Sequence, residues 1–488
     1  MIKRLALLAF VILVVVSAVY ALRDQKKVTT SSEKAYKAFL AGRELMYKLY
    51  YREAVQEFEN AVKLDSNFAM AFCRLAILQR DYFGNKNKAD SLIKKAISAF
   101  PRIKEKERQI ISIVETDTKA DYKKGRALRD AFIAKYPECM ESHEYLAIQY
   151  QEAREYERAI GEYEKILKID PNDALAYNMM AYLNYFLRNY DIAIDNVKKY
   201  VFIAGEQANP HDSYGEILMN VGKYDEAIAQ FNEANKIKPD LYFVLMHLGW
   251  AYSQIGRLRD AIGYFERAKD NAVNQSQINN CDLACAESYW AYADYDKSFN
   301  IATKFLESHP NYIPALGLRG SLAAETGNLA LAGDDLKRID SLLSNNALPE
   351  SLAGEMTTKE RLGLVKNRVA GMIAANQGDY ETAITLIREI ADSTVLPSKL
   401  WQRAILAHIY VHMGNYPKAR ELYLLNLQDN PNHGLTLQWL AELYGILKQP
   451  EEQKETLLRY LSVMSGGDED LPAIKAARAQ LNKLIQMP

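Results

Sequence analysis

Residues 242–268 read YFVLMHLGWAYSQIGRLRDAIGYFERA, and this stretch decides the fold. Small residues stand at Gly249 and Ala261, and an aromatic residue stands at Phe265. The segment that begins 34 residues earlier, 208–234, reads ANPHDSYGEILMNVGKYDEAIAQFNEA and has small and aromatic residues at the same places. The chain therefore repeats its own pattern at a fixed step.

The repeat holds its register over four consecutive segments. Four series of residues spaced by 34 show it: Ala159, Ala193, Ala227 and Ala261; Ala147, Ala181, Gly215 and Gly249; Tyr156, Tyr190, Tyr224 and Leu258; Tyr163, Val197, Phe231 and Phe265. Small side chains let two helices approach closely, and the aromatic side chains fill the space between one unit and the next. Prolines on the same grid end the second helix of a unit, because proline cannot continue it. The pattern predicts stacked pairs of antiparallel helices.

This pattern resembles the tetratricopeptide repeat, a helix–turn–helix unit of 34 residues. The resemblance covers roughly residues 35–460 and is strongest over 140–268. It implies an all-α fold: a right-handed α-solenoid of about a dozen helix–turn–helix units, closed by a C-terminal capping helix. The low proline content, 14 in 488 residues, is typical of such a helical chain.

The register also predicts how the chain is organised. We expect a signal peptide or transmembrane anchor at 1–22, a linker at 23–34, an N-terminal array at 35–344, a loop or hinge at 345–356, a C-terminal array at 357–464, and a loop with the capping helix at 465–488. The hinge is predicted because the register is lost where turn-forming residues gather, and an insertion in a solenoid maps to a loop.

The N-terminus differs from the rest of the chain. Residues 5–22 are uncharged and apolar and follow Lys3 and Arg4. A helix of that length approaches the ~30 Å hydrocarbon core of a bilayer, so we expect an uncleaved anchor. The alternative is a cleaved signal peptide, because residues 19–21 are of the type that a signal peptidase reads.

An apolar N-terminus followed by a long array resembles bacterial envelope repeat proteins. The resemblance implies a place in the cell envelope. We expect inner-membrane anchoring with the repeats on the non-cytoplasmic side, or a periplasmic or secreted protein if the signal is cleaved.

Composition and motifs argue against other classes of function. With 61 basic and 62 acidic residues the net charge is -1, whereas nucleic-acid binders show a basic excess, so we predict no nucleic-acid partner. No phosphate-binding loop, dinucleotide fingerprint or zinc-protease motif occurs, and we expect no cofactor. His408 and His412 have a spacing that can place two imidazoles on one metal. No third ligand stands nearby in sequence, so we expect groove histidines and no metal site.

In the tetratricopeptide family, the first helices of successive units line a concave groove. The resemblance places on it Glu144, Asn178, Tyr182, Tyr185, Asp212, Glu216, Phe243, Met246, Trp250, Glu287 and Trp290. Aromatic residues among carboxylates are typical of a protein-binding surface. We hypothesise that a partner segment of some basic character contacts four of them: Tyr182, Tyr185, Trp250 and Trp290. The alternative is that these side chains only pack within the superhelix.

We therefore predict a non-enzymatic protein–protein interaction scaffold, tethered to a membrane through residues 5–22 or exported. One alternative is a carrier of a small ligand, a sugar or a lipid, in the aromatic groove. The other is an enzyme hidden in the divergent segments 103–137 or 343–357, which lack clustered residues of catalytic type.

Overall fold

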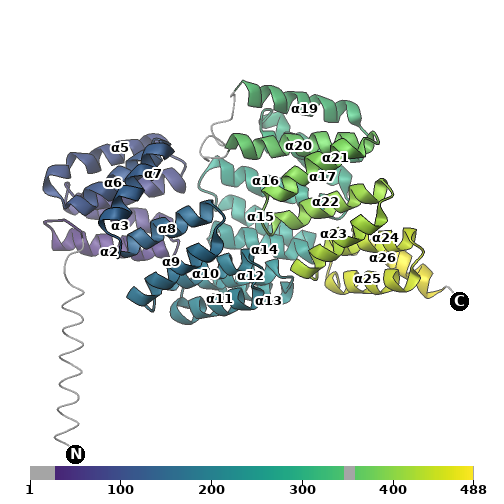
Figure 1. Cartoon of the computed structure of the whole chain (residues 1–488), viewed down its shortest axis with the longest axis horizontal. Coiled ribbons are helices and arrows are strands. Elements are labelled where there is room, and N and C mark those ends of the chain that lie inside the picture. The colour runs from purple at the N-terminus through teal and green to yellow at the C-terminus, as the bar shows by residue number, and fades with distance from the viewer. Residues whose placement is uncertain (1–27, 346–357, 487–488) are drawn as a thin grey trace, which may run out of the picture. The chain divides into compact units, whose positions relative to one another are not determined.

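The computed structural model describes residues 28–345 and 358–486. All regular structure in these ranges is helical, as predicted. The chain divides into two compact units, Met1–Tyr136 and Pro137–Pro488 (Figure 1). The predicted anchor at 1–22 and, apart from Asn345, the predicted hinge lie outside the described residues. Within those residues, no helix combines the length and the apolar character that crossing a membrane requires.

The first unit contains three helical pairs. Its elements are α2 (Glu33–Tyr47), α3 (Tyr51–Leu64), α4 (Ala69–Asp81), α5 (Lys86–Ser98), the short 3₁₀ helix η1 (Phe100–Arg102), α6 (Glu105–Thr118) and α7 (Tyr122–Lys135). Buried aromatic rings join the first pair to the next: the centroid of Phe39 lies 5.6 Å from that of Phe58 and 4.9 Å from that of Phe68.

The end of the predicted linker at 23–34 belongs to the folded unit. The Thr29 amide donates to Glu107 Oε1 at 2.6 Å, and the Thr30 hydroxyl donates to Asp65 Oδ2 at 2.5 Å. The Ser32 hydroxyl caps α2 by accepting from the third amide after it. Polar residues of the predicted linker therefore donate hydrogen bonds to two carboxylates of the repeats. The composition of the segment does not reveal these contacts.

The second unit contains nine helical pairs and a final helix. Its elements are α8 (Met140–Glu152), α9 (Tyr156–Ile169), α10 (Ala174–Phe186), α11 (Tyr190–Ala204), α12 (Ala208–Asn220), α13 (Tyr224–Ile237), α14 (Tyr242–Gln254), α15 (Leu258–Asp270), α16 (Gln275–Ala291), α17 (Tyr295–Ser308), α18 (Ile313–Glu325), α19 (Leu329–Ser344), α20 (Thr358–Asn376), α21 (Tyr380–Ser393), α22 (Ser398–His412), α23 (Tyr416–Asp429), α24 (Gly434–Ile446), α25 (Pro450–Val463) and α26 (Pro472–Ile485). With the first unit, the described chain has twelve pairs, in agreement with the dozen units expected.

The small residues of the repeat lie where the two helices of a pair cross. A Cβ atom at Gly249 of α14 would lie 2.3 Å from Cε1 of Phe265 in α15, closer than real Cβ contacts come. At the preceding unit, a Cβ at Gly215 would lie 2.6 Å from the Phe231 ring. The small and aromatic series are thus the two sides of one contact, repeated at each step.

The turns inside four consecutive pairs share one backbone conformation. Arg154, Arg188, Gly222 and Gly256 stand one period apart, and all have positive φ, from 58° to 82°. The last two are glycines, which adopt this left-handed conformation without steric cost. These four turns form a row along one edge of the second unit, and the later helices of the same unit dock on that row.

Asp429, the last residue of α23, is the most connected residue of this docking. It is 3% exposed and accepts hydrogen bonds from Arg403 at 2.9 Å, from Arg188 at 3.0 Å and from the Tyr190 hydroxyl at 2.8 Å. Arg188 and Tyr190 flank the start of the fifth pair's second helix, whereas Arg403 and Asp429 belong to the eleventh pair. The superhelix of the second unit therefore closes on itself within six pairs.

The other turns of the row make similar contacts. Arg154 Nη2 donates to the carbonyl of Ser393 at 2.7 Å. The carbonyl of Gly222 accepts from Asn432 at 2.9 Å, and that of Gly256 accepts from the Asp468 amide at 2.8 Å.

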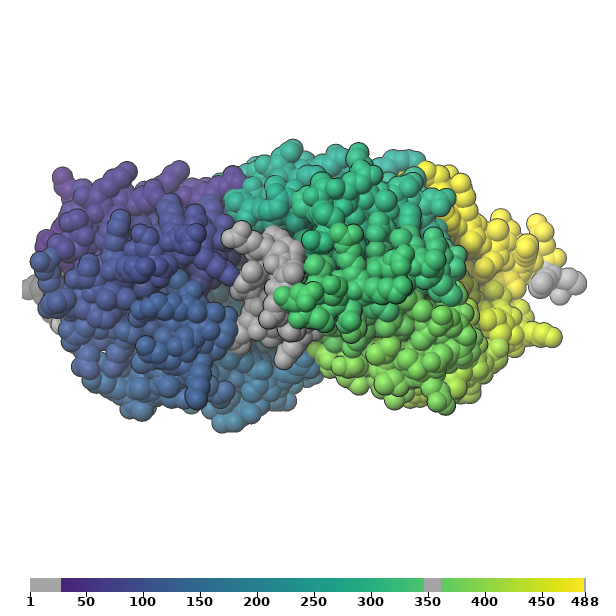
Figure 2. Space-filling view, turned by 90° about the horizontal axis from the view of Figure 1, so that it is seen from above, coloured from purple at the N-terminus to yellow at the C-terminus, as the bar shows by residue number. Residues whose placement is uncertain are grey.

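An apolar cluster completes the closure at the C-terminal end. Leu258 and Tyr292 from the middle pairs pack with Tyr460, Met464 and Ile474 from α25 and the segment through α26. In Figure 2 the later helices of this unit, green to yellow, form a surface continuous with the teal helices. Helix α26 thus docks on the turns of earlier pairs as well as following the last pair.

Candidate functional site

Because the superhelix of the second unit closes, the predicted groove is not an open channel. It is a wall that contains the two pockets described below. The eleven predicted groove residues fall into three groups: those in a partly buried polar network, those packed elsewhere, and those that line a pocket.

The polar network joins the first helices of the fifth, sixth and seventh pairs. The Tyr182 hydroxyl donates to Glu216 Oε2 at 2.6 Å, and His247 Nδ1 lies 2.9 Å from Asp212 Oδ1. Burial opposes a charge on His247, but the carboxylates of Asp212 and Glu216 outweigh it and raise the pKa of His247 to about 9. His247 is therefore an imidazolium at neutral pH, and this network holds the helices together.

Four predicted residues lie outside both pockets and this network. Tyr185 is 1% exposed and packs against Tyr190 and, across the closed superhelix, beside Leu396 and Leu400. For Tyr185 the structure contradicts partner contact, because later helices of the same chain cover it. Asn178 is buried, and two residues are half-buried on their helices: Glu144 and Phe243.

Three predicted residues line what we call the groove pocket. Its volume is about 630 Å³, and Met246, Trp250 and Glu287 form one side of it. The other side comes from α20 and α22, with Arg368 and Gln402. Burial raises the pKa of Glu287 and lowers that of Arg368, and each charge counters the effect of burial on the other.

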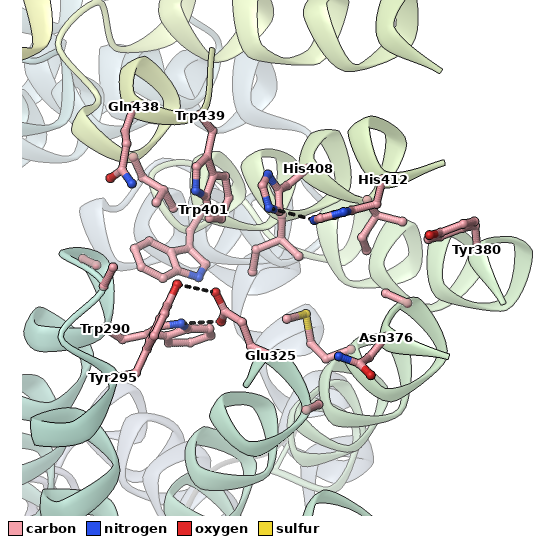
Figure 3. A pocket seen from close by; sticks show the side chains of 18 residues that line it. Trp290, Tyr295, Glu325, Asn376, Tyr380, Trp401, His408, His412, Gln438 and Trp439 are labelled. Carbon is pink, nitrogen blue, oxygen red and sulfur yellow. Dashed lines mark hydrogen bonds between the residues drawn. The ribbon is translucent and has the colours of Figure 1, made fainter. Parts of the chain in front are cut away.

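The remaining predicted residue, Trp290, lines a second cavity that we call the indole pocket. The volume of this cavity is about 270 Å³. Its aromatic residues come from α16, α17, α21, α22 and α24: Trp290, Tyr295, Tyr380, Trp401, His408 and Trp439 (Figure 3). Trp290 and Trp401 meet edge to face, with ring centroids 5.4 Å apart. Trp290 itself is 7% exposed, so it forms the floor of the pocket.

A single carboxylate lies among these rings. Glu325, at the end of α18, accepts from Trp290 Nε1 at 2.7 Å and from the Tyr295 hydroxyl at 2.8 Å, one donor on each oxygen (Figure 3). Burial raises the pKa of Glu325, and the two hydrogen bonds oppose that rise. Within the described ranges Glu325 has no ion pair.

The two histidines lie at the side of the indole pocket, as Figure 3 shows. His408 Nε2 and His412 Nε2 are 3.1 Å apart, and the His408 ring stacks on Trp439 with centroids 4.4 Å apart. Burial, with a contribution from His412, lowers the pKa of His408 to about 3, so this imidazole is neutral. The described part of the chain contains no group of three or more His, Cys, Asp or Glu side chains that could hold a metal.

Sequence reasoning missed most of the indole pocket. Tyr295, Glu325, Trp401 and Trp439 are not among the predicted groove residues, the last of which is Trp290. A composition signal was present: the chain has four tryptophans, and three of them line this pocket.

Comparisons with known proteins agree with the repeat. Three segments match tetratricopeptide-repeat models, at residues 119–174, 211–241 and 244–276. Superkiller complex protein 3 of Mus musculus is 23% identical over 246 residues, which cover 46% of this chain and 15% of that protein. DnaJ homolog subfamily C member 3 of Rattus norvegicus is 27% identical over 178 residues, which cover 36% of this chain and 33% of that protein. The matches thus span a third or less of these relatives' own length.

Matches among solved structures include MamA, at 22% identity and a TM-score of 0.28 over 33% of this chain and 93% of that one. The Cut9–Hcn1 hetero-tetramer gives 14% identity and a TM-score of 0.32 over 93% of this chain and 97% of that one. The family matches, together with twelve helical pairs in the described residues, identify this chain as an all-α solenoid built of tetratricopeptide repeats.

Proposed function

We propose that this chain is a non-enzymatic scaffold that holds partner proteins on the wall formed by the groove pocket and the indole pocket. Tetratricopeptide-repeat proteins generally act by binding other proteins, and this chain has the repeat. The observation that carries the proposal is the indole pocket. Three tryptophans and two tyrosines gather there beside a carboxylate, which is the composition of an interface anchor site.

The test uses side chains that are partly exposed on the wall. Trp250 and Trp439 suit it, whereas Trp290 does not, because truncating so buried an indole costs about 3–5 kcal/mol of stability. The matched control is Phe202, an aromatic residue of α11 that is 92% exposed and lines neither pocket.

The full chain and each alanine variant are used to capture cross-linked partners from membranes of the native host. We expect one reproducible partner whose recovery falls in Trp250→Ala or Trp439→Ala and stays unchanged in Phe202→Ala. Equal recovery in all three variants would contradict binding at this wall. A co-purifying small molecule without any protein partner would favour the ligand carrier.

We further propose that residues 5–22 tether the repeats to a membrane, in the cell envelope. The support is the sequence: this stretch is uncharged and long enough to approach the width of a bilayer. Fractionation of the full chain and of a form that begins at residue 23, with N-terminal sequencing of each, tests the proposal. Recovery of the full chain, uncleaved, in the soluble fraction would rule out tethering.

A further inference from the structure

The indole pocket holds a negative charge without a positive partner. Both oxygens of Glu325 accept hydrogen bonds, from Trp290 and from Tyr295, and the indole N–H can only donate. Accepting hydrogen bonds on both oxygens favours the carboxylate form of Glu325 and opposes the burial that raises its pKa. Within the described residues no cationic group forms an ion pair with Glu325, and the neighbouring His408 is neutral.

One nearby cation, Arg368, belongs to the groove pocket. Arg368 lies over the Trp290 ring, 5.8 Å from its centroid, but it lines the groove pocket, where Glu287 is the carboxylate that acts on it. A buried charge is costly unless a counter-charge or several hydrogen bonds offset the loss of water. Glu325 has two neutral donors and further lone pairs that accept, so a donor that also carries positive charge suits it best.

The walls of the pocket favour the same chemistry. The faces of tryptophan and tyrosine attract cations, most strongly where water is excluded. A second carboxyl group lies close to the pocket: Glu442 accepts from the pocket residue Gln438 at 3.5 Å, and burial raises its pKa. The charge of Glu442 acts with that of Glu325 on the Tyr295 hydroxyl. The Trp290 N–H and the Tyr295 hydroxyl already donate to Glu325, so neither can donate to a neutral ligand.

The size of the pocket limits the ligand. A volume of about 270 Å³ equals roughly nine water molecules at their share of liquid volume. That space admits one head group or one long side chain and excludes a folded segment. We propose that the indole pocket binds an alkylammonium group, either free or at the end of a lysine side chain of the partner, between its aromatic faces and Glu325. This inference rests on the proposed function only in placing the ligand on the partner-binding wall.

The experiment compares cations with neutral molecules of the same shape. The purified full chain, in an uncharged maltoside detergent, is titrated with choline and with 3,3-dimethylbutan-1-ol, and tryptophan fluorescence and calorimetry report binding. Nα-acetyl-lysine amide, which keeps its side-chain ammonium group, and Nα-acetyl-norleucine amide form the second pair. We expect the cation of at least one pair to bind about tenfold or more tightly than its neutral counterpart. Choline alone would indicate a free ligand, and the lysine amide alone a partner side chain.

Variants then assign the preference to the pocket. Glu325→Gln keeps the shape of the side chain and removes its charge, and we expect the cation preference to disappear. Glu307→Gln, an exposed change on α17, is the matched control and should keep it. If Glu325→Gln perturbs the helical circular dichroism, Trp439→Leu replaces it and must also lower the preference.

Equal affinity for cation and neutral counterpart in the unmodified chain, or no binding of either cation, would overturn the inference. A preference for the cation that remains in both the Glu325→Gln and the Trp439→Leu variants would also overturn the inference. Partner capture that still depends on Trp250 would in that case leave the proposed scaffold function standing.

Discussion

Replacing Asp429 with Asn removes the charge at the centre of the docked superhelix while keeping the size of the side chain. The Asp429 and Arg403 side chains are 3% and 5% exposed, and their atoms Oδ2 and Nη1 are 2.9 Å apart. Removing one partner of a buried pair leaves the other charge buried and uncompensated, which costs about 3–5 kcal/mol. Arg188 also donates to Oδ2, the Tyr190 hydroxyl donates to Oδ1, and asparagine keeps only one acceptor oxygen, so we expect the upper part of that range.

Hydrogen exchange followed by mass spectrometry measures this effect where it arises. Repeat arrays open locally, so the free energy of opening is read from the amides of α22 and α23 and of the turn at Arg188. A double variant that removes both charges separates the cost of an unpaired charge from the other contacts of the pair. Arg403→Met combined with Asp429→Leu should be much less destabilising than Asp429→Asn alone, because no charge stays buried.

An exposed ion pair on the same docking surface gives the comparison. Arg259 and Asp470 are 2.9 Å apart and solvent-exposed, and Asp470→Asn should cost less than about 1 kcal/mol. A loss within about 0.5 kcal/mol for Asp429→Asn, the size of an ordinary surface change, would refute the reasoning that Asp429 holds the docked helices.

Two further predictions concern packing and pH. Gly249→Ala should lower the free energy of unfolding by about 1–3 kcal/mol, because the added Cβ would lie 2.3 Å from the Phe265 ring. Gly263→Ala is the control: no atom lies within 4 Å of its added Cβ, so it should be neutral or stabilising. Urea unfolding of both variants measures the two free energies. The folded-state pKa of His247, about 9, lies above its ordinary value of 6.5, so its pair with Asp212 stabilises fully below about pH 6.5 and is lost as the pH rises to 9. The difference amounts to about 3 kcal/mol, and His247→Asn should flatten the decline of stability over that pH range; an unchanged decline would contradict the imidazolium.

Much of the fold could be predicted because the repeat pattern reflects contacts between residues that are close in the sequence. Phe231 lies against Gly215 of its own pair and packs on His247 of the next pair, so the spacing of these residues along the chain encodes the contact directly. The tandem order of the pairs then follows, because each pair buries apolar surface against the next one along the chain. The linker at 23–34 was less predictable, since Thr29 and Thr30 bind carboxylates far along the chain.

The candidate site could be predicted only in part. Trp250 of α14 and Glu287 of α16, two residues that the register places on the groove, line the groove pocket. Tyr185 occupies an equivalent position and is nevertheless covered by Leu396 and Leu400. Position within a repeat tells which way a side chain points, but it does not tell what the chain places in front of it.

By itself the sequence determined that this protein is a stack of antiparallel helical pairs, since contacts between near neighbours leave their period in the chain. Only the tertiary structure decided that the second unit closes on itself through Asp429 and that Glu325 lies among three indoles. The physical reason is that small rotations from pair to pair accumulate, and their sum brings together residues whose separation follows no period.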